Sequence, residues 1–265
     1  MRSATELLPE RPQGGETVHP LAAASDPGRA LQVHAHAREM IRRMREPDPM
    51  PVAEYDARGL IRRDMRERRH ADAFRDLRTQ LVTRLQGRNG AILVAPVSPG
   101  AGASHVAMNL AAAFAFDESH TALLIDCNLR DPVLDARLGV DASAGGLTDF
   151  LDGESPSIEA LIRPTGVPRL RLVPAGTARE ASSEYLASYR LRGLVEHLRG
   201  RYPDRYIILD APAIKGSPDA RILAQLADAA IVVAGYGSDT PAAIRSAVMT
   251  LDATKVAGVV FNDAT

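Results

Sequence analysis

The chain has 265 residues, of which 45% are hydrophobic, so it is long enough to bury a core of ordinary size. Its formal net charge is −1, but residues 1–90 carry 17 arginines against 13 acidic residues, which leaves the remainder at −5. This distribution argues against a nucleic-acid partner for the C-terminal part, and the apolar runs are too short to span a bilayer. The N-terminus lacks the apolar centre of a secretory signal, so we expect a cytoplasmic protein whose single cysteine, Cys127, is a small buried residue.

The first 66 residues are predicted to form an N-terminal extension. Residues 1–29 are rich in Pro, Gly, Glu and Ala without periodicity, which is typical of disorder. Residues 30–46 have apolar residues at helical spacing beside four arginines, and the segment PDPMP ends this helix. Two interpretations of the helix stay open: a solvated basic helix, or a docking helix for a partner or an anionic membrane surface.

Residues 67–265 are predicted to form one folded domain. A helical pattern over 68–86 leads into a regular alternation of strands and helices. Strands are predicted at 91–94, 122–125, 170–173, 206–209, 231–234 and 256–261, and helices at 104–116, 190–199 and 241–251. This alternation indicates an α/β fold with a mostly parallel sheet, helices on both of its faces and functional loops at the carboxyl ends of the strands.

The segment SPGAGAS has the outline of a phosphate-binding loop. Gly100 and Gly102 let backbone N–H groups approach a phosphate closely, and Ser104 begins a helix whose positive end faces the anion. The general signature G-x-x-x-x-G-K-S/T is broken twice, because Val97 stands at its first glycine and Ala103 at its lysine. The loop therefore keeps its backbone pattern and lacks its cation.

Three segments in this order resemble the nucleotide-binding motifs of the bacterial tyrosine kinases: SPGAGAS, LLIDCNLRDP and YIILDAP. The resemblance runs from about Asp72 to the end of the chain, and the ordered set is specific although each motif alone is weak. Members of this family are deviant Walker-type ATPases that accompany polysaccharide co-polymerases in capsule and exopolysaccharide export. The resemblance implies a P-loop NTPase-like fold, here in a degenerate, pseudokinase-like member.

The resemblance assigns a nucleotide cradle of eight residues: Pro99, Gly100, Ala101, Gly102, Ala103, Ser104, His105 and Asn262. Ala101 and Ala103 replace the Glu and the Lys of the family's first motif. Asn262 matches a residue that contacts the adenine. From the residues alone, His105 has no second ligand at metal spacing, so we expect it on the surface of the helix.

The other two motifs carry carboxylates. Asp126 begins the charged part of the second motif, in which Asn128 replaces a second Asp, and Asp210 lies in the third. The resemblance implies that Ser104, Asn128 and Asp210 surround Mg²⁺, and that Asp126 accepts the proton of an attacking tyrosine hydroxyl. Phosphoryl transfer relies on charge aimed at the phosphoryl oxygens, and loss of a comparable stabiliser typically costs roughly 10²–10³ in rate. We therefore expect ATP or ADP with Mg²⁺ to bind weakly or not at all.

A replacement for the missing cation is hard to find in the sequence. Lys215, one of only two lysines, lies in the loop after the third motif, at the same sheet edge as the phosphate loop. It is either a solvated loop residue or a stand-in for the missing charge. The sequence also stops shortly after its last predicted strand, without the cluster of tyrosines that kinases of this family use as substrate.

These features predict a kinase-like adaptor of exopolysaccharide or capsule biosynthesis and export, without tyrosine kinase activity. The alternative is an active tyrosine autokinase or ATPase with a non-standard loop, and a MinD-like positioning ATPase is disfavoured because the C-terminal part is acidic. The resemblance implies a polysaccharide co-polymerase as partner, with the chain held peripherally at the inner membrane. Self-association is expected through Asp72, Arg75 and Arg78, which resemble the family's E-x-x-R-x-x-R helix, although such charges are commonly just solvated.

Overall fold

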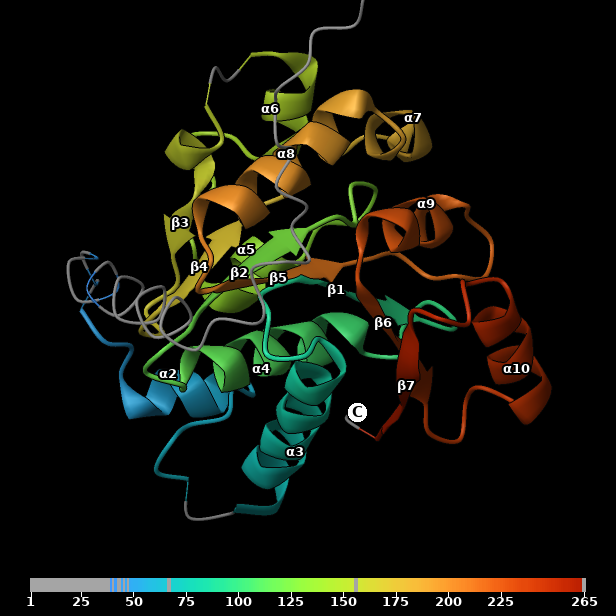
Figure 1. Cartoon of the computed structure of the whole chain (residues 1–265), viewed down its shortest axis with the longest axis horizontal. Helices are drawn as coiled ribbons and strands as arrows, with labels where there is room; N and C mark the ends of the chain where they lie inside the picture. The colour runs from blue at the N-terminus through green and yellow to red at the C-terminus, as the bar shows by residue number, and fades with distance from the viewer. Residues whose placement is uncertain are drawn as a thin grey trace, which may run out of the picture.

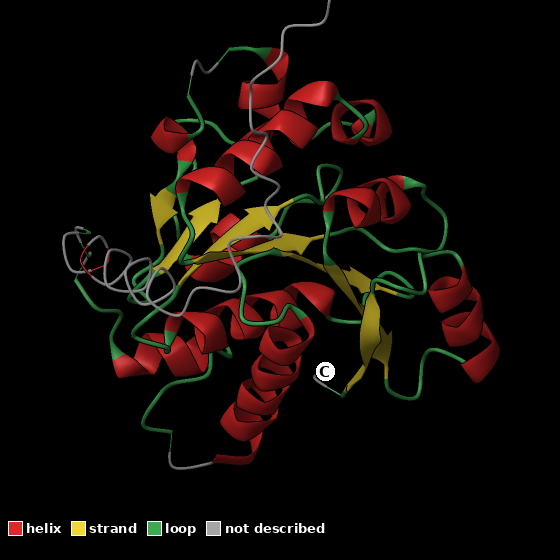
Figure 2. Cartoon of the chain, in the orientation of Figure 1, coloured by secondary structure: helices red, strands yellow, loops and turns green. Residues whose placement is uncertain are grey.

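The structure is a computed structural model that describes residues 39, 41, 44, 46, 48–65, 68–154 and 157–263. Most of the predicted extension lies outside the described residues, including the disorder predicted for 1–29 and most of the helix predicted over 30–46. The described part folds as a central sheet between two layers of helices (Figure 1 and Figure 2). The apolar runs of the sequence form the strands of the sheet, and the segments with helical periodicity form helices that cover it.

Among the described residues the sheet has seven strands: β1 (Ala91–Pro96), β2 (Thr121–Asp126), β3 (Arg163–Pro164), β4 (Leu170–Val173), β5 (Arg205–Asp210), β6 (Ala229–Gly235) and β7 (Val256–Asn262). Their spatial order is β3-β4-β2-β5-β1-β6-β7. Neighbouring strands are parallel except for β3 and β4, which are antiparallel. The predicted mostly parallel sheet is confirmed, and all six predicted strands are present with their ends shifted by at most two residues.

The α-helices are α2 (Val52–Ala57), α3 (Arg68–Arg84), α4 (Ala103–Ala115), α5 (Leu134–Leu138), α6 (Leu147–Asp152), α7 (Ser182–Leu186), α8 (Tyr189–Arg201), α9 (Asp219–Leu226) and α10 (Pro241–Met249), and η2 (Glu159–Leu161) is a 3₁₀ helix. Figure 1 shows α2, α3 and α4 on one side of the sheet and α6, α7, α8 and α9 on the other, so the predicted cover on both faces is confirmed. None of the helices in the described ranges is long and apolar enough to span a membrane. The sequence analysis did not predict the short helices, because a helix of one or two turns is too short for its apolar residues to show a helical period.

Two hydrophobic cores lie on the two faces of the sheet, and they follow the alternation of side chains along each strand. In β1, Ile92 and Val94 pack in the core with α3 and α4, whereas Ala91 and Leu93 pack in the core with α8 and α9. The α4 helix is buried around most of its circumference because α3 covers its outer side. Burial on both faces explains why the inner strands β1, β2, β5 and β6 are mostly apolar runs in the sequence.

The segment that precedes α3 packs onto the domain, although the sequence analysis placed it in the extension. Met50, Tyr55, Leu60 and Ile61 are buried in the core shared with α3 and α4. The Ile61 N–H donates to Asn109 Oδ1 of α4 at 2.7 Å, so the backbone is tied down as well. The predicted boundary after residue 66 therefore needs correction, because four residues between Met50 and Ile61 already lie in the core of the folded unit.

Ile61→Ala is expected to destabilise the protein by about 2–5 kcal/mol, because Ile61 is fully buried and the substitution leaves a cavity. Val52→Ala is the control: this side chain is 53% exposed, so the free energy of unfolding should change by less than about 0.5 kcal/mol. Urea unfolding followed by circular dichroism compares the variants. If Ile61→Ala unfolds at the same urea concentration as the wild type, the segment does not belong to the folded unit.

Candidate nucleotide-binding site

The phosphate loop joins β1 to α4 at the carboxyl edge of the parallel strands. Gly100 and Gly102 have left-handed backbone conformations, with φ of 82° and 81°, which residues with a Cβ rarely adopt. A Cβ on Gly102 would lie 2.1 Å from Asn262 Nδ2, so a side chain at this position would displace Asn262 as well as strain the backbone. The α4 helix begins at Ala103 without a side-chain cap, which leaves the N–H groups of its first turn available to an anion.

Asn262 lies beside this loop, where the resemblance requires it. From the end of β7, its Nδ2 donates to the Ala101 carbonyl at 3.1 Å and ties the last strand to the loop. A cavity of about 560 Å³ adjoins Asn262, and its walls include His70, Phe74 and Phe261. This volume is in the range of small-molecule sites, so a nucleoside could be accommodated next to the phosphate loop. Contact between Asn262 and an adenine stays a prediction.

Two carboxylates meet at the same edge of the sheet. Asp126 at the end of β2 and Asp210 at the end of β5 are paired in parallel register, and both are fully buried. Burial raises the pKa of Asp126 to about 7, and three backbone N–H groups that donate to its carboxylate oppose this shift. These donors belong to Asn128, Val133 and Leu134, at 3.1, 3.2 and 3.2 Å. The loop after β2 therefore holds Asp126 in a fixed orientation.

Among the described residues, Asp210 has fewer hydrogen-bond partners than Asp126. Burial raises its pKa well above the ordinary value and the Asp126 charge adds to the shift, whereas the Ser104 hydroxyl and the Arg137 guanidinium oppose it. Among the described residues, neither carboxylate oxygen of Asp210 has a hydrogen-bond partner of ordinary geometry. A cation relieves such a pair, and carboxylate and hydroxyl oxygens suit Mg²⁺. The residues present therefore fit the Mg²⁺ that the resemblance implies, with Ser104 and Asp210 as its holders.

No complete metal cage accompanies these carboxylates. Within the described ranges, no three His, Cys, Asp or Glu side chains cluster so that they could hold a metal ion by themselves. A Mg²⁺ ion at this edge would therefore need water or phosphate oxygens as further ligands, which is the ordinary arrangement for Mg²⁺ in phosphate-binding sites.

The two substituted positions lie at this edge and supply no charge. Ala103 is the buried first residue of α4 and offers only a methyl group to the loop. Asn128 Nδ2 donates to the Asp131 carbonyl at 2.7 Å, so the backbone of its own loop holds the amide nitrogen. Asn128 as a neighbour of Mg²⁺ stays a prediction.

Two cations lie near the loop. The Lys215 N–H donates to the Val97 carbonyl at 3.2 Å, which places the backbone of this lysine against the start of the loop, while its side chain is exposed. Arg137 of α5 was not singled out from the sequence. Its charge acts on both Asp210 and His105, so it lies close to the carboxylate pair. No sequence signal could have identified it, because α5 is outside the three motifs.

His105 is more enclosed than a helix-surface position, which corrects the expectation from its sequence. Its ring lies 5.7 Å from the His70 ring of α3, edge to face, and a Cβ on Gly59 would lie 3.2 Å from its Cε1. Burial lowers the pKa of His105, and the charges of His70 and Arg137 lower it further. The imidazole is therefore held mainly in its neutral form, and its place in the nucleotide cradle stays a prediction.

Cys127 is fully buried, as predicted, and burial raises the pKa of its thiol. The charges predicted to mediate self-association make contacts within the chain. Arg75 contacts Asp72 Oδ1 at 2.7 Å and the Arg63 carbonyl at 3.1 Å. Arg78 Nη1 donates to the Ala113 carbonyl at the end of α4, also at 3.1 Å. These contacts hold both guanidinium groups in place on α3, and self-association through them stays a prediction.

Comparison with known proteins shows which proteins the chain is similar to in sequence. No family model matches the chain. It is similar to the succinoglycan biosynthesis transport protein ExoP of Rhizobium meliloti, with 30% identity over 249 residues that cover 92% of this chain and 31% of ExoP. It is also similar to the tyrosine-protein kinase CpsD of Streptococcus pneumoniae, with 33% identity over 173 residues that cover 64% of this chain and 74% of CpsD.

The fold is shared with solved kinase domains. The BceF tyrosine kinase domain superposes with a TM-score of 0.66 at 26% identity, covering 89% of this chain and 97% of that domain. The chain spans about a quarter of the length of several longer tyrosine-protein kinases, which it matches over 192 to 195 residues. The match therefore concerns one domain of those longer proteins.

Asp210→Asn is expected to stabilise the metal-free protein at pH 8, because burial disfavours the charged form of this carboxyl and the amide carries no charge. The folded state raises the pKa of Asp126 from 3.8 to about 7. The stability that the protonated Asp126 carboxyl contributes is therefore full below pH 3.8 and is lost as the pH rises through about 7. Thermal unfolding in EDTA at pH 5 and pH 8 measures the effect, with about 2–4 °C expected for each kcal/mol relieved.

The same experiment has a metal arm. Excess Mg²⁺ at pH 8 should raise the melting temperature of the wild type more than that of Asp210→Asn, because the cation neutralises the carboxylate pair. If Asp210→Asn is less stable than the wild type at pH 8 in EDTA, the pair is not under electrostatic strain and the interpretation is wrong.

Proposed function

Since the chain belongs to the bacterial tyrosine kinase family, we propose that it is a kinase-like regulatory or adaptor protein of exopolysaccharide or capsule biosynthesis and export. The name of ExoP supports the polysaccharide role, because it connects a protein of which this chain matches one part with transport in succinoglycan biosynthesis. The family resemblance supports a polysaccharide co-polymerase as partner. In this proposal the chain works peripherally on the cytoplasmic side of the inner membrane, through that partner.

The observation that carries the proposal is a complete carboxylate pair beside a phosphate loop without an ammonium group. Ala103 stands where the family's lysine would face the phosphate oxygens. At about 4 Å and an effective dielectric of 20, one unit charge pair contributes about 4 kcal/mol. Since catalysis of phosphoryl transfer is mainly positioning and charge, we infer a rate that is lower by roughly 10²–10³ than with the lysine present.

Nucleotide binding is the property that the remaining groups support. The loop N–H groups and the first turn of α4 favour a phosphate, and Ser104 with Asp210 would hold Mg²⁺, which supplies positive charge against the phosphate oxygens. A hydrogen bond to a charged group contributes only about 1.5–3 kcal/mol, so several backbone donors can offset one lost lysine in the ground state. The proposed protein binds ATP or ADP weakly and regulates its partner through its fold rather than through turnover.

An active kinase or ATPase is the second candidate function, and a specific observation favours it. The backbone of Lys215 touches the start of the phosphate loop, and the Arg137 charge reaches the carboxylate pair. Either side chain could supply a cation to a bound triphosphate. In that case Asp126, held by three backbone N–H groups, would act as the base that accepts the proton of a tyrosine hydroxyl.

In a calorimetric titration the full chain should bind Mg-ATP weakly, and incubation with Mg-ATP and the cytoplasmic tail of a partner should yield no phosphotyrosine. Ala103→Lys should tighten Mg-ATP binding by about tenfold or more, because it returns a charge to the phosphate oxygens. Arg192→Lys, a conservative change on the exposed side of α8, is the control and should leave the affinity unchanged.

Robust phosphotransfer by the wild type that is lost in Asp126→Ala would overturn the proposed loss of catalysis. Turnover that is lost in Lys215→Ala or in Arg137→Gln would then identify the replacement cation. A wild-type protein that binds no nucleotide at any tested Mg²⁺ concentration would show that the loop is only a structural turn.

Self-association is the second part of the proposal. Arg75→Glu combined with Arg78→Glu should lower the sedimentation coefficient of the complex with the partner, because it reverses two charges on α3. Arg69→Glu combined with Arg88→Glu makes the same change in net charge outside the motif and should leave the assembly intact. Identical sedimentation profiles for the two double variants would contradict a specific role of the motif.

A further inference from the structure

A second polar site lies at the amino ends of β2, β4 and β5, opposite the nucleotide edge. Arg171 of β4 and Arg205 of β5 are each only 7% exposed, although arginine is rarely buried without a charged partner. Both side chains line one cavity of about 350 Å³, together with Thr121 and Tyr202. This volume is in the range of small-molecule sites.

The guanidinium group of Arg205 lines the cavity and is held there by two neighbouring side chains. Its guanidinium carbon lies 3.8 Å from the centre of the Tyr202 ring, and its Nε donates to Thr121 Oγ1 at 3.3 Å. The Thr121 hydroxyl in turn donates to Asp204 Oδ2 at 2.9 Å, so the threonine accepts from the arginine and is itself held. A stacked guanidinium uses its face and keeps its in-plane N–H groups for a further partner. Among the described residues, the hydrogen bond of ordinary geometry from this side chain is the one from Nε, and the Tyr202 side chain and the Asp204 charge are its further polar neighbours.

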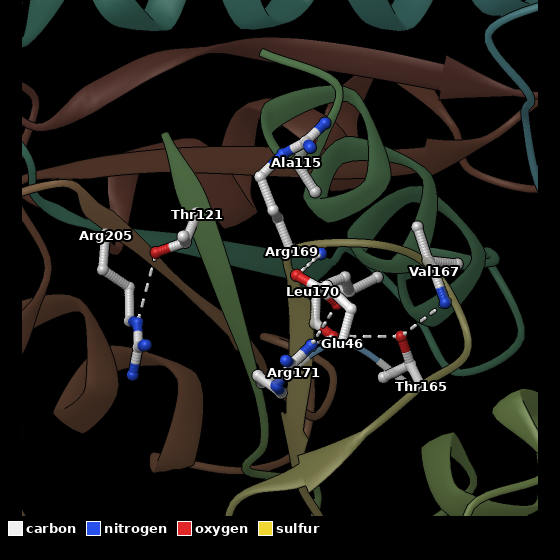
Figure 3. Close-up of polar contacts among 9 residues, drawn as sticks. All are labelled: Glu46, Ala115, Thr121, Thr165, Val167, Arg169, Leu170, Arg171 and Arg205. Carbon is white, nitrogen blue, oxygen red and sulfur yellow. Dashed lines mark hydrogen bonds and ion pairs between the residues drawn. The ribbon is translucent and has the colours of Figure 1, made fainter. Parts of the chain in front are cut away.

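A carboxylate already occupies one side of the arginine pair. Glu46 accepts a hydrogen bond from the Arg169 N–H at 3.0 Å and one from Arg171 Nη1 at 3.2 Å (Figure 3). Glu46 comes from the segment that leads into α2, and Ile41 and Met44 of the same segment line the cavity. The N-terminal segment therefore covers this site and places an anion on it.

The other acidic side chains at the cavity are engaged elsewhere. Glu159 pairs with His197 at 3.2 Å, and Asp204 accepts from Thr121. Burial lowers the pKa of Arg205, which means that this guanidinium is poorly solvated where it lies. Among the described residues, Arg205 is thus a buried cation whose acidic neighbours at the cavity, Glu159 and Asp204, are engaged with other groups.

We propose that this cavity is a second anion-binding site, which takes the phosphate or carboxylate group of a small molecule on Arg205 and Arg171 in competition with Glu46. A guanidinium fork binds either group through parallel N–H donors. The contact with the Tyr202 ring holds the orientation of the planar Arg205 guanidinium group, and the hydrogen bond to Thr121 holds its Nε. Binding displaces Glu46 from Arg171 and so loosens the N-terminal segment from the domain. The site is at the opposite edge of the sheet from the phosphate loop and does not depend on the proposed function.

The test is thermal unfolding of the full chain in inorganic phosphate and, separately, in glutarate, each against chloride at equal ionic strength. All measurements use a Ser104→Asp background, because the phosphate loop also attracts anions and an added carboxylate repels them from it. In this background either probe should still raise the melting temperature. The probe with the larger rise assigns the ligand chemistry, phosphate or carboxylate.

Arg205→Gln should weaken the apparent affinity for the better probe by about tenfold or more, because it removes the fork. Glu46→Gln should tighten it by about threefold to tenfold, since the internal competitor loses its charge. Arg192→Gln makes the same charge change as Arg205→Gln on the exposed side of α8 and should have no effect.

No rise in melting temperature with either probe overturns the proposal, and so does a rise that neither Arg205→Gln nor Glu46→Gln changes. If Arg205→Gln does not fold, Glu46→Gln decides alone, because Glu46 lies outside the core and its substitution leaves the fold intact.

Discussion

The burial of two neighbouring carboxylates is the constraint on which the candidate site depends. Asp126 and Asp210 end neighbouring parallel strands in register, so the sheet itself brings them together in an environment that disfavours charge. The two are not equivalent: three backbone N–H groups satisfy Asp126, whereas Asp210 has no hydrogen bond of ordinary geometry among the described residues. The site is therefore incomplete without a cation, and the hydroxyl of Ser104 lies where such a cation would be held. A phosphate loop with two left-handed glycines and an uncapped helix end completes the cradle for the anion.

The substitutions change the charge of this site and leave its shape. Ala103 is buried at the start of α4, and Asn128 is held by the backbone of its own loop, so neither position distorts the strands or the loop. Backbone donors and a helix end stabilise a phosphate in its ground state, whereas catalysis needs charge that follows the phosphoryl group into the transition state. This difference is the reason for our proposal that the site holds a nucleotide more readily than it cleaves one. The proposed adaptor role rests on that difference.

Charge is separated along the sheet. The single strand β5 begins with Arg205 and ends with Asp210, and its six residues span about 20 Å. The residues between these two ends are apolar and buried on both faces of the sheet, so the arginine end and the carboxylate end lie a strand length apart. Each end can therefore hold a ligand of opposite charge. The N-terminal segment belongs to the arginine end, where Glu46 meets Arg171, and the match to ExoP over 249 residues also extends into this segment.

The sequence by itself determined the alternation of strands and helices, the phosphate loop and the carboxylates at the strand ends. These features are local: they depend on apolar periodicity, on glycine positions and on the residue that follows a strand. Only the tertiary structure decided that Met50, Tyr55, Leu60 and Ile61 belong to the core, that the Arg137 charge acts on Asp210 and that Arg205 is buried at a cavity. The reason is that burial and the field at a charge depend on neighbours far away in the chain, such as Asn109 for Ile61 and Thr121 for Arg205.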